Sequence, residues 1–322
     1  MGSPSEFSQI PVLDLAPLRD GQDTTALAEA FAEAYGTTGF GYIINHGVDP
    51  NLREAVFAAS RAFHALPEDQ KQAIALDNNH RGYIAINTST DVNSELAEVT
   101  KPNQSASFMM MREDAKADPD TYLSGPNQWP DQPNFRETCE AYILAMTELG
   151  QKLMKLALQA IGATDDGFLD AFAPPTLWLR LLHYPPQPPQ SPDDLYGSAP
   201  HKDFGCLTLL AQDDVGGLQV QTPKGNWVDA PPMKDAFVVN VGDMLHRLSN
   251  GRLLSTPHRV INTSGRERYS VPFFFDPHVA TTIAPLPGTG APQFEPIRFG
   301  DFLRSELEAS YDAHKSGETA DE

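Results

Sequence analysis

The sequence "SAPHKDFGCLTLL" (198–210) places a histidine and an aspartate, His201 and Asp203, at the head of an apolar run that is typical of a β-strand. Side chains two positions apart on a strand point to the same face, so these two could bind one metal ion together. An H-x-D pattern also occurs by chance at polar strand ends, and the pair alone does not distinguish the two cases. The remainder of the chain has to supply further ligands.

The segment after Pro174 is a succession of short β-type runs divided by turn-forming residues. They read "LWLRLLHY" (177–184), "CLTLLAQ" (206–212), "GGLQVQT" (216–222), "AFVVNVG" (236–242), "HRVINT" (258–263) and "YSVPFFF" (269–275). Short strands at such regular spacing indicate a β-sandwich or a β-barrel.

The part before Pro174 has a mainly helical pattern. Apolar spacing predicts strands at 10–18 and 40–46, helices at 24–39, 50–66 and 67–76, and a long helix at 133–161. Residues 77–132 lack periodicity and are expected to be irregular, with the apolar patch "SFMMM" (107–111) forming either an adaptable lid or core. We expect an N-terminal helical region at 8–132, a long helix and connection at 133–176, a β core at 177–280 and an extension with a helix at 281–322.

Composition excludes some classes of function. The chain of 322 residues carries a formal net charge of −20, which argues against binding to nucleic acid or an anionic membrane. Two distant cysteines form no disulfide framework, which favours a cytoplasmic protein, and no apolar run is long enough for a membrane span. The sequence does not reveal the oligomeric state.

A third metal ligand could come from a different strand. His258, in "STPHRVIN" (255–262), follows Asp203 by 55 residues and begins a β-branched run. By itself it could equally be an ordinary strand histidine. Ten residues later, Arg268 and Ser270 again share one face of a strand, and a guanidinium beside a hydroxyl suits a carboxylate. The alternative is a surface ion pair, but the following "VPFFF" should be buried, and a buried arginine needs an anionic partner.

These patterns together resemble one enzyme family. The stretches "HKDFGCLTLLAQDDVGGLQVQ" (201–221), "VVNVGDMLHRLSNGRLLSTPHRVIN" (238–262) and "GRERYSVPFFFDP" (265–277), with "IPVLDLAPL" (10–18) and "GFGYIINHGVD" (39–49), resemble the isopenicillin N synthase-like Fe(II)/2-oxoglutarate-dependent dioxygenases. The resemblance implies an α+β fold in which a double-stranded β-helix (jelly-roll) core carries an N-terminal helical domain packed on it.

The resemblance also implies a site and a reaction. His201, Asp203 and His258 would bind Fe(II) as two histidines and a carboxylate on one side of the metal. Arg268, Ser270 and Tyr184 would hold the cosubstrate 2-oxoglutarate. The enzyme would couple decarboxylation of 2-oxoglutarate by O₂ to hydroxylation, desaturation or cyclisation of a small molecule, with ascorbate as a possible stimulant. The commonest family pattern has Asn and Cys where this chain has Leu182 and Gln187.

Three other functions compete with this one. An oxidase of the isopenicillin N synthase or ACC oxidase type would use no 2-oxoglutarate, and Arg268 and Ser270 would then hold a carboxylate of the substrate. A zinc hydrolase is disfavoured because the chain has no H-E-x-x-H motif. A non-catalytic binding protein is disfavoured because all three metal ligands are kept.

Candidate substrate-binding residues are Arg180, Phe273 and Phe275. Arg180 shares a strand face with Tyr184, and the alternative for it is a structural ion pair. One of the two phenylalanines could wall the substrate pocket, and the alternative for both is core. Lys202, between the two expected ligands, should point to the opposite face of the strand and be dispensable for metal binding.

Overall fold

The computed structural model describes residues 6–89, 101–118, 120–164, 166–188, 190–192 and 194–310. Residues 90–100 of the expected irregular region and 311–322 of the expected extension lie outside this part. The helices are α1 (Ala16–Arg19), α2 (Thr25–Thr37), α3 (Pro50–His64), α4 (Glu68–Gln72), α5 (Phe135–Ala160), the 3-10 helix η1 (Asp166–Phe172), α6 (Asp243–Leu248) and α7 (Phe299–Ser310). Within the described ranges, no helix is long and apolar enough to cross a membrane.

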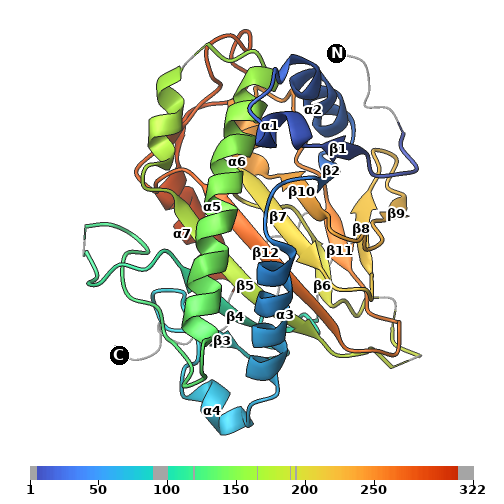
Figure 1. Cartoon of the computed structure of the whole chain (residues 1–322), viewed down its shortest axis with the longest axis vertical. Coiled ribbons are helices and arrows are strands. Elements are labelled where there is room, and N and C mark those ends of the chain that lie inside the picture. Colours follow the sequence, from blue (N-terminus) through green and yellow to red (C-terminus); the bar gives the residue numbers. More distant parts are fainter. Residues whose placement is uncertain are drawn as a thin grey trace.

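Two β-sheets form the centre of the molecule (Figure 1). The larger has the order β1 (Val12–Asp14), β2 (Phe40–Ile44), β10 (Phe237–Val241), β7 (Leu207–Gln212), β12 (Arg268–Asp276), β5 (Thr176–Tyr184), β4 (Ala106–Met111) and β3 (Gly82–Ile84). The smaller has the order β6 (Ser198–His201), β11 (His258–Val260), β8 (Leu218–Gln221) and β9 (Trp227–Asp229). A two-stranded ribbon, β13 (Thr282–Ile283) with β14 (Ile297–Arg298), stands apart.

From β5 onward the chain alternates between the two sheets. β5, β7, β10 and β12 belong to the larger sheet, whereas β6, β8 with β9, and β11 belong to the smaller one. Two antiparallel sheets connected in this alternating way are a double-stranded β-helix, so the expected jelly-roll core is confirmed. The N-terminal region is helical only in part, because it also supplies β1 to β4 at both edges of the larger sheet.

Side chains along β5 and β12 alternate between two faces of the larger sheet, and each face packs mainly into a different buried cluster. Odd-numbered residues of both strands, Leu177 and Phe273 among them, belong to a large core shared with α2, α3 and α5. Even-numbered residues face the other way. Leu182 and Tyr184 join a smaller cluster with Phe40, Leu218 and Val260 of neighbouring strands, whereas Trp178 and Phe274 also contact the large core. In Figure 1, α3 and α5 lie across the front of the larger sheet. The inside of the jelly roll is therefore lined by the even-numbered face.

Several expected elements differ in the structure. The strand expected at 10–18 ends at Asp14, and α1 follows it. The region 77–132 holds two paired strands, and "SFMMM" lies inside β4 with all five residues buried, so the lid hypothesis for this patch is wrong and the core alternative is right. Sequence periodicity missed these strands because β4 is apolar apart from Ser107 and does not alternate. The short elements β9, α6, β13 and β14 were not predicted.

Candidate metal centre and cosubstrate pocket

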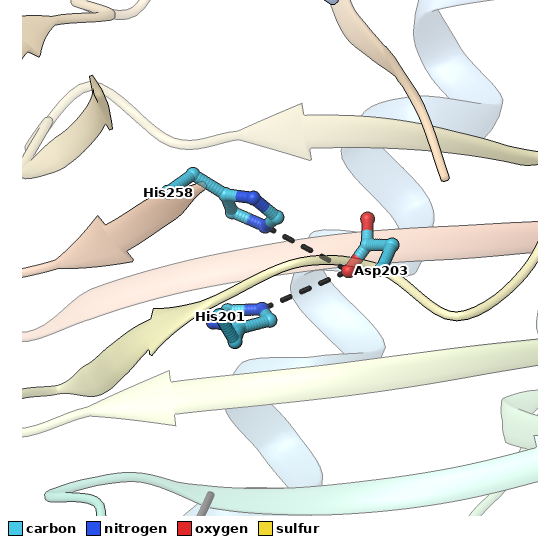
Figure 2. Close-up of side chains that lie close together, drawn as sticks. All are labelled: His201, Asp203 and His258. Atoms are coloured by element: carbon cyan, nitrogen blue, oxygen red, sulfur yellow. Dashed lines mark ion pairs between the residues drawn. The ribbon is translucent and has the colours of Figure 1, made fainter. Parts of the chain in front are cut away.

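Two histidines and one aspartate meet inside the jelly roll. His201 ends β6 and His258 begins β11, and they are direct partners across this antiparallel pair. Nε2 of His201 and Nε2 of His258 each lie 3.7 Å from Oδ1 of Asp203. Figure 2 shows the three side chains converging from these two strands and the loop after β6. One ligand atom from each residue lies within 4.8 Å of the others, which is the spacing of a candidate metal centre.

Asp203 does not lie on the strand on which it was predicted. β6 ends at His201, so Asp203 lies in the loop between β6 and β7 and does not share a strand face with His201. The tight loop that brings it inward requires Gly205, since a Cβ there would lie 1.9 Å from Oδ1 of Asp276. Lys202 lies in the same loop and is among the residues that line the cavity, so the strand alternation from which it was predicted to face away does not apply.

Hydrogen bonds orient each potential ligand. Nδ1 of His201 lies 2.7 Å from the carbonyl of Ala199, and Nδ1 of His258 lies 3.3 Å from the carbonyl of Thr256. A carbonyl can only accept, so these contacts place the proton on Nδ1 and leave the Nε2 lone pairs for a metal.

Asp203 is oriented in the same way by two neighbouring strands. Its Oδ2 accepts hydrogen bonds from Asn240 on β10, at 2.7 Å, and from Thr208 on β7. Its Oδ1 faces the two histidines. Sequence reasoning missed Asn240 and Thr208, although Asn240 is the single polar residue of β10 and Thr208 is a polar residue in the mainly apolar β7, a pattern that signals a hydrogen-bonding role.

The charge states of the three groups suit Fe(II). Burial opposes ionisation of Asp203, but the adjacent His258 and His201 and the hydrogen bonds from Asn240 and Thr208 outweigh it and lower the pKa of the carboxyl. Burial and the neighbouring His201 lower the pKa of His258 to about 4. Neutral imidazole and ionised carboxylate are the forms that bind a metal, and two histidines with one carboxylate are the donor set of non-haem Fe(II) oxygenases.

A buried arginine lies in the same cavity. Arg268 is fully buried, and its guanidinium lies 4.6 Å from the centre of the Tyr184 ring. Nε donates to the carbonyl of Gly216 at 2.5 Å and Nη2 donates to Oε1 of Gln212 at 3.1 Å. Nη1 has no partner among the described residues. A buried cation with an unused donor fits an incoming carboxylate, and Ser270 lies two positions further along the same face.

The cavity that joins these groups has a volume of about 140 Å³. Four even-numbered residues from each of the two central strands line it: Trp178, Arg180, Leu182 and Tyr184 of β5, and Arg268, Ser270, Pro272 and Phe274 of β12. Further lining comes from Met109 of β4, Phe204 of the metal-site loop and Leu307 of α7.

The structure brings together most, but not all, of the expected site residues. His201, Asp203, His258, Arg268, Ser270, Tyr184 and Arg180 all line the cavity. Phe273 and Phe275 do not line it, because they lie fully buried on the opposite face of β12 in the core beside the helices. The prediction that they contact substrate is therefore wrong, and the cavity side of β12 carries Pro272 and Phe274 instead. The prediction assigned the odd-numbered residues of this strand to the cavity, although Ser270 already indicated that the even-numbered face lines it.

Comparison with known proteins shows the family to which the chain belongs. The model of the 2OG-Fe(II) oxygenase superfamily matches residues 175–277, and the model described as non-haem dioxygenase in morphine synthesis N-terminal matches residues 10–132. A 2-oxoglutarate-Fe(II) type oxidoreductase, hxnY, of Emericella nidulans is 36% identical over 94% of this chain and 90% of its own length. A homoarginine-6-hydroxylase of Glycine max is 31% identical over 94% of this chain and 97% of its own.

Solved structures agree with the sequence relatives. A full-length Neurospora crassa protein in complex with alpha-KG and thymine has a TM-score of 0.83 at 30% identity, covering 96% of this chain and 99% of that one. JOX2 in complex with 2OG, Fe and JA has a TM-score of 0.78 at 28% identity, covering 94% of this chain and 89% of that one.

The chain belongs to the 2OG-Fe(II) oxygenase superfamily. It is a 2-oxoglutarate-dependent dioxygenase whose cofactor is Fe(II) and whose cosubstrates are 2-oxoglutarate and O₂. The oxidase that dispenses with 2-oxoglutarate is not favoured, because the relatives are named as 2-oxoglutarate enzymes and the Neurospora crassa structure holds alpha-KG. Stimulation by ascorbate stays a prediction.

Proposed function

We propose that His201, Asp203 and His258 bind the catalytic Fe(II), and that Arg268, Ser270 and Tyr184 hold the distal carboxylate of 2-oxoglutarate during oxidation of a small molecule. The observation that carries the metal assignment is the position of Asp203 Oδ1, 3.7 Å from Nε2 of both histidines. Three donor atoms on one side of a metal leave its other side free for further ligands.

The cosubstrate assignment rests on the partly satisfied guanidinium of Arg268. The protein uses Nε and Nη2 to hold this side chain in place and leaves Nη1 without a partner among the described residues. A buried charge without a counter-ion is costly, and a dicarboxylate bound here would relieve that cost. Ser270, on the same cavity face, is placed to add a hydroxyl donor to the same carboxylate.

The iron and 2-oxoglutarate supply the oxidising power when bound, because decarboxylation of the keto acid by O₂ provides a reagent able to attack a C–H bond. The residues of the chain bind the metal and the cosubstrate, orient them and keep water out of the cavity. Asn240 and Thr208 hold Asp203 so that one carboxylate oxygen faces the metal position. Apolar side chains of the jelly roll, such as Phe40 and Leu218, line the cavity beside the metal site and limit the access of water.

The substrate is proposed to be a small molecule. The Neurospora crassa protein is described with thymine and with 5-formyluracil, and its structure superposes on nearly the whole of this chain. A cavity enclosed by a jelly roll and lined in part by α7 suits a compound of that scale better than a polymer.

Binding and turnover test this function separately. We expect the purified protein to bind Mn(II), a redox-stable substitute for Fe(II), and to bind 2-oxoglutarate more tightly when Mn(II) is present. With Fe(II) and O₂ it should form succinate from 2-oxoglutarate, slowly without a substrate. His201→Ala and Asp203→Ala should abolish metal binding, and Arg268→Gln should weaken 2-oxoglutarate binding at unchanged metal affinity.

Lys234→Ala is the matched control, because Lys234 is exposed and lies outside the cavity. The metal assignment fails if Asp203→Ala binds Mn(II) as tightly as the unchanged protein does. The cosubstrate assignment fails if Arg268→Gln leaves the affinity for 2-oxoglutarate unaltered.

A further inference from the structure

We propose that Arg180 binds a carboxylate of the substrate that the enzyme oxidises. The enzyme would then act on small carboxylic acids with an apolar body. This inference rests on the proposed function and adds the substrate class to it. The observations that carry it are the place of Arg180 in the cavity, its unused hydrogen-bond donor and the charge balance of the site.

Arg180 lies well away from the proposed cosubstrate site along the same strand. Arg268 pairs with Tyr184 across β5 and β12, and Ser270 pairs with Leu182. Arg180 lies four residues from Tyr184 along β5, a distance of roughly 13 Å at the rise of a strand. The carboxyl carbons of a five-carbon diacid are only about 5 Å apart, given ordinary carbon–carbon bond lengths. The backbones of the two arginines therefore stand at separate positions along the cavity, so that each guanidinium can serve a different carboxylate.

The guanidinium of Arg180 is held in place but not neutralised. Nη2 donates to Oγ of Ser107 on β4 at 2.9 Å, and Ser107 is itself buried. Nε is buried and has no partner among the described residues. Within that part of the chain, no carboxylate lies within the 4.0 Å of an ion pair with Arg180. A structural ion pair, the alternative considered for Arg180, is not observed there.

Trp178, two residues before Arg180 on the same face of β5, also carries a buried donor. Trp178 lines the cavity and carries a second buried donor, indole Nε1, that has no partner among the described residues. Guanidinium and indole N–H groups can only donate, so a ligand that satisfies both must offer acceptor atoms. A carboxylate offers two oxygens in the plane that an arginine side chain recognises best.

The formal charges of the site leave room for one anion. With Fe(II) and 2-oxoglutarate bound, the charges of the metal, Asp203, Arg268, Arg180 and the dianionic cosubstrate add up to one positive charge. The lining holds one more cation, Lys202, which lies near Asp243; burial raises the pKa of this carboxyl, and Lys202 offsets that rise only in part. A substrate with a carboxylate would reduce the positive charge of the cavity, which a buried site favours.

Apolar residues neighbour Arg180 in the sheet and line the same cavity. Met109 pairs with Arg180 across β4 and β5, and Phe274 pairs with Trp178 across β12 and β5. The rings of Trp178 and Phe274 meet edge to face, with centroids 5.5 Å apart, at the cavity wall. These residues offer contact to an apolar or aromatic body and no further charge, so the recognised anion is expected to be a single group on an otherwise apolar molecule.

The test compares small aromatic and aliphatic acids with their primary amides, which keep the shape but lack the charge. Binding to the Mn(II)–2-oxoglutarate complex is measured by calorimetry, and stimulation of succinate formation is measured with Fe(II). We expect some acids to bind and stimulate, and their amides to bind at least tenfold more weakly. Arg180→Gln should lose this preference, Arg180→Lys should keep part of it, and both should retain the affinity for 2-oxoglutarate.

Arg136→Gln on α5 is the control, because it removes the same charge from an exposed side chain outside the cavity. The proposal is overturned if no acid binds, if amides bind as tightly as acids, or if Arg180→Gln keeps the preference. A loss of 2-oxoglutarate affinity in Arg180→Gln would assign the guanidinium to the cosubstrate and also overturn it. Failure of the unchanged protein to bind 2-oxoglutarate would instead refute the proposed function.

Discussion

His201 and His258 face each other across the antiparallel pair β6 and β11, with ring centroids 4.2 Å apart. Residues directly opposite on antiparallel strands are held at a distance set by the backbone. The sheet therefore sets the spacing of the two backbone positions, and the hydrogen bonds to the carbonyls of Ala199 and Thr256 orient the imidazoles. Asp203 lies on the following loop, and its carboxylate is held by hydrogen bonds from Asn240 and Thr208.

Replacing Asn240 should loosen the metal site without removing a ligand. Asn240→Ala takes away one of the two donors that hold Asp203 Oδ2, so the carboxylate is less well oriented. We expect the affinity for Mn(II) to fall by roughly 10- to 100-fold, the usual effect of losing such a partner. Titration followed by the electron paramagnetic resonance of free Mn(II) measures it. An affinity equal to that of the Lys234→Ala control would show that Asn240 does not orient the ligand.

Gly197→Ala should weaken 2-oxoglutarate binding indirectly. A Cβ at this position would lie 2.8 Å from Cδ1 of Tyr184, so the ring has to shift from its place beside the Arg268 guanidinium. We expect the KM for 2-oxoglutarate to rise several-fold while metal affinity stays unchanged. Gly36→Ala, on α2, is a control at a tight position outside the cavity. Equal KM values for the two variants would mean that the position of Tyr184 is unimportant for the cosubstrate.

Substitutions on the two faces of β12 should affect different properties, stability on one face and substrate recognition on the other. Phe273→Ala removes a fully buried ring from the core beside the helices and should lower the free energy of unfolding by about 3–5 kcal/mol. Phe274→Ala removes a ring from the cavity wall and should chiefly reduce stimulation of succinate formation by substrate. Chemical denaturation and the turnover assay measure the two effects. A larger stability loss in Phe274→Ala than in Phe273→Ala would contradict the placement of the strand.

Stability should depend on the ionisation of Asp276. This carboxyl is buried, and burial raises its pKa to about 7 although Oδ1 accepts a hydrogen bond from the N–H of Cys206. Because the folded pKa lies above the ordinary value of 3.8, the folded state prefers the protonated form. The stabilising contribution is complete below about pH 4 and is lost as the pH rises towards 7.

Asp276→Asn should remove this pH dependence. Its amide oxygen can still accept from Cys206, and no charge has to be buried. We expect the variant to be more stable than the unchanged protein at pH 8 by about 2–4 kcal/mol, and similar to it near pH 4, where the carboxyl is protonated. Thermal unfolding at a series of pH values measures the difference, with Asp301→Asn on α7 as an exposed control. A difference that is the same at both pH values would rule out titration of Asp276 as its cause.

Local patterns predicted those features that depend on neighbouring residues. The helices at 24–39, 50–66 and 133–161 follow from apolar spacing, and α2, α3 and α5 occupy these ranges. The β-runs from 177 to 275 were recognisable from their length and their turn residues. The segment "SFMMM" was ambiguous because an apolar run without alternation suits core and lid equally, and only its pairing with β3 and β5 places it in the sheet.

The sequence by itself determined the residue types of the site: two histidines and an aspartate, an arginine with a serine two positions on, and Arg180 in phase with Tyr184. Tertiary structure decided which of these side chains meet, because contacts between residues far apart in the chain depend on strand register. It placed Asp203 on a loop, turned Phe273 and Phe275 away from the cavity, and left Nη1 of Arg268 and Nε of Arg180 without described partners. Whether a buried donor is satisfied depends on every segment that packs around it, and no local pattern of residues carries that information.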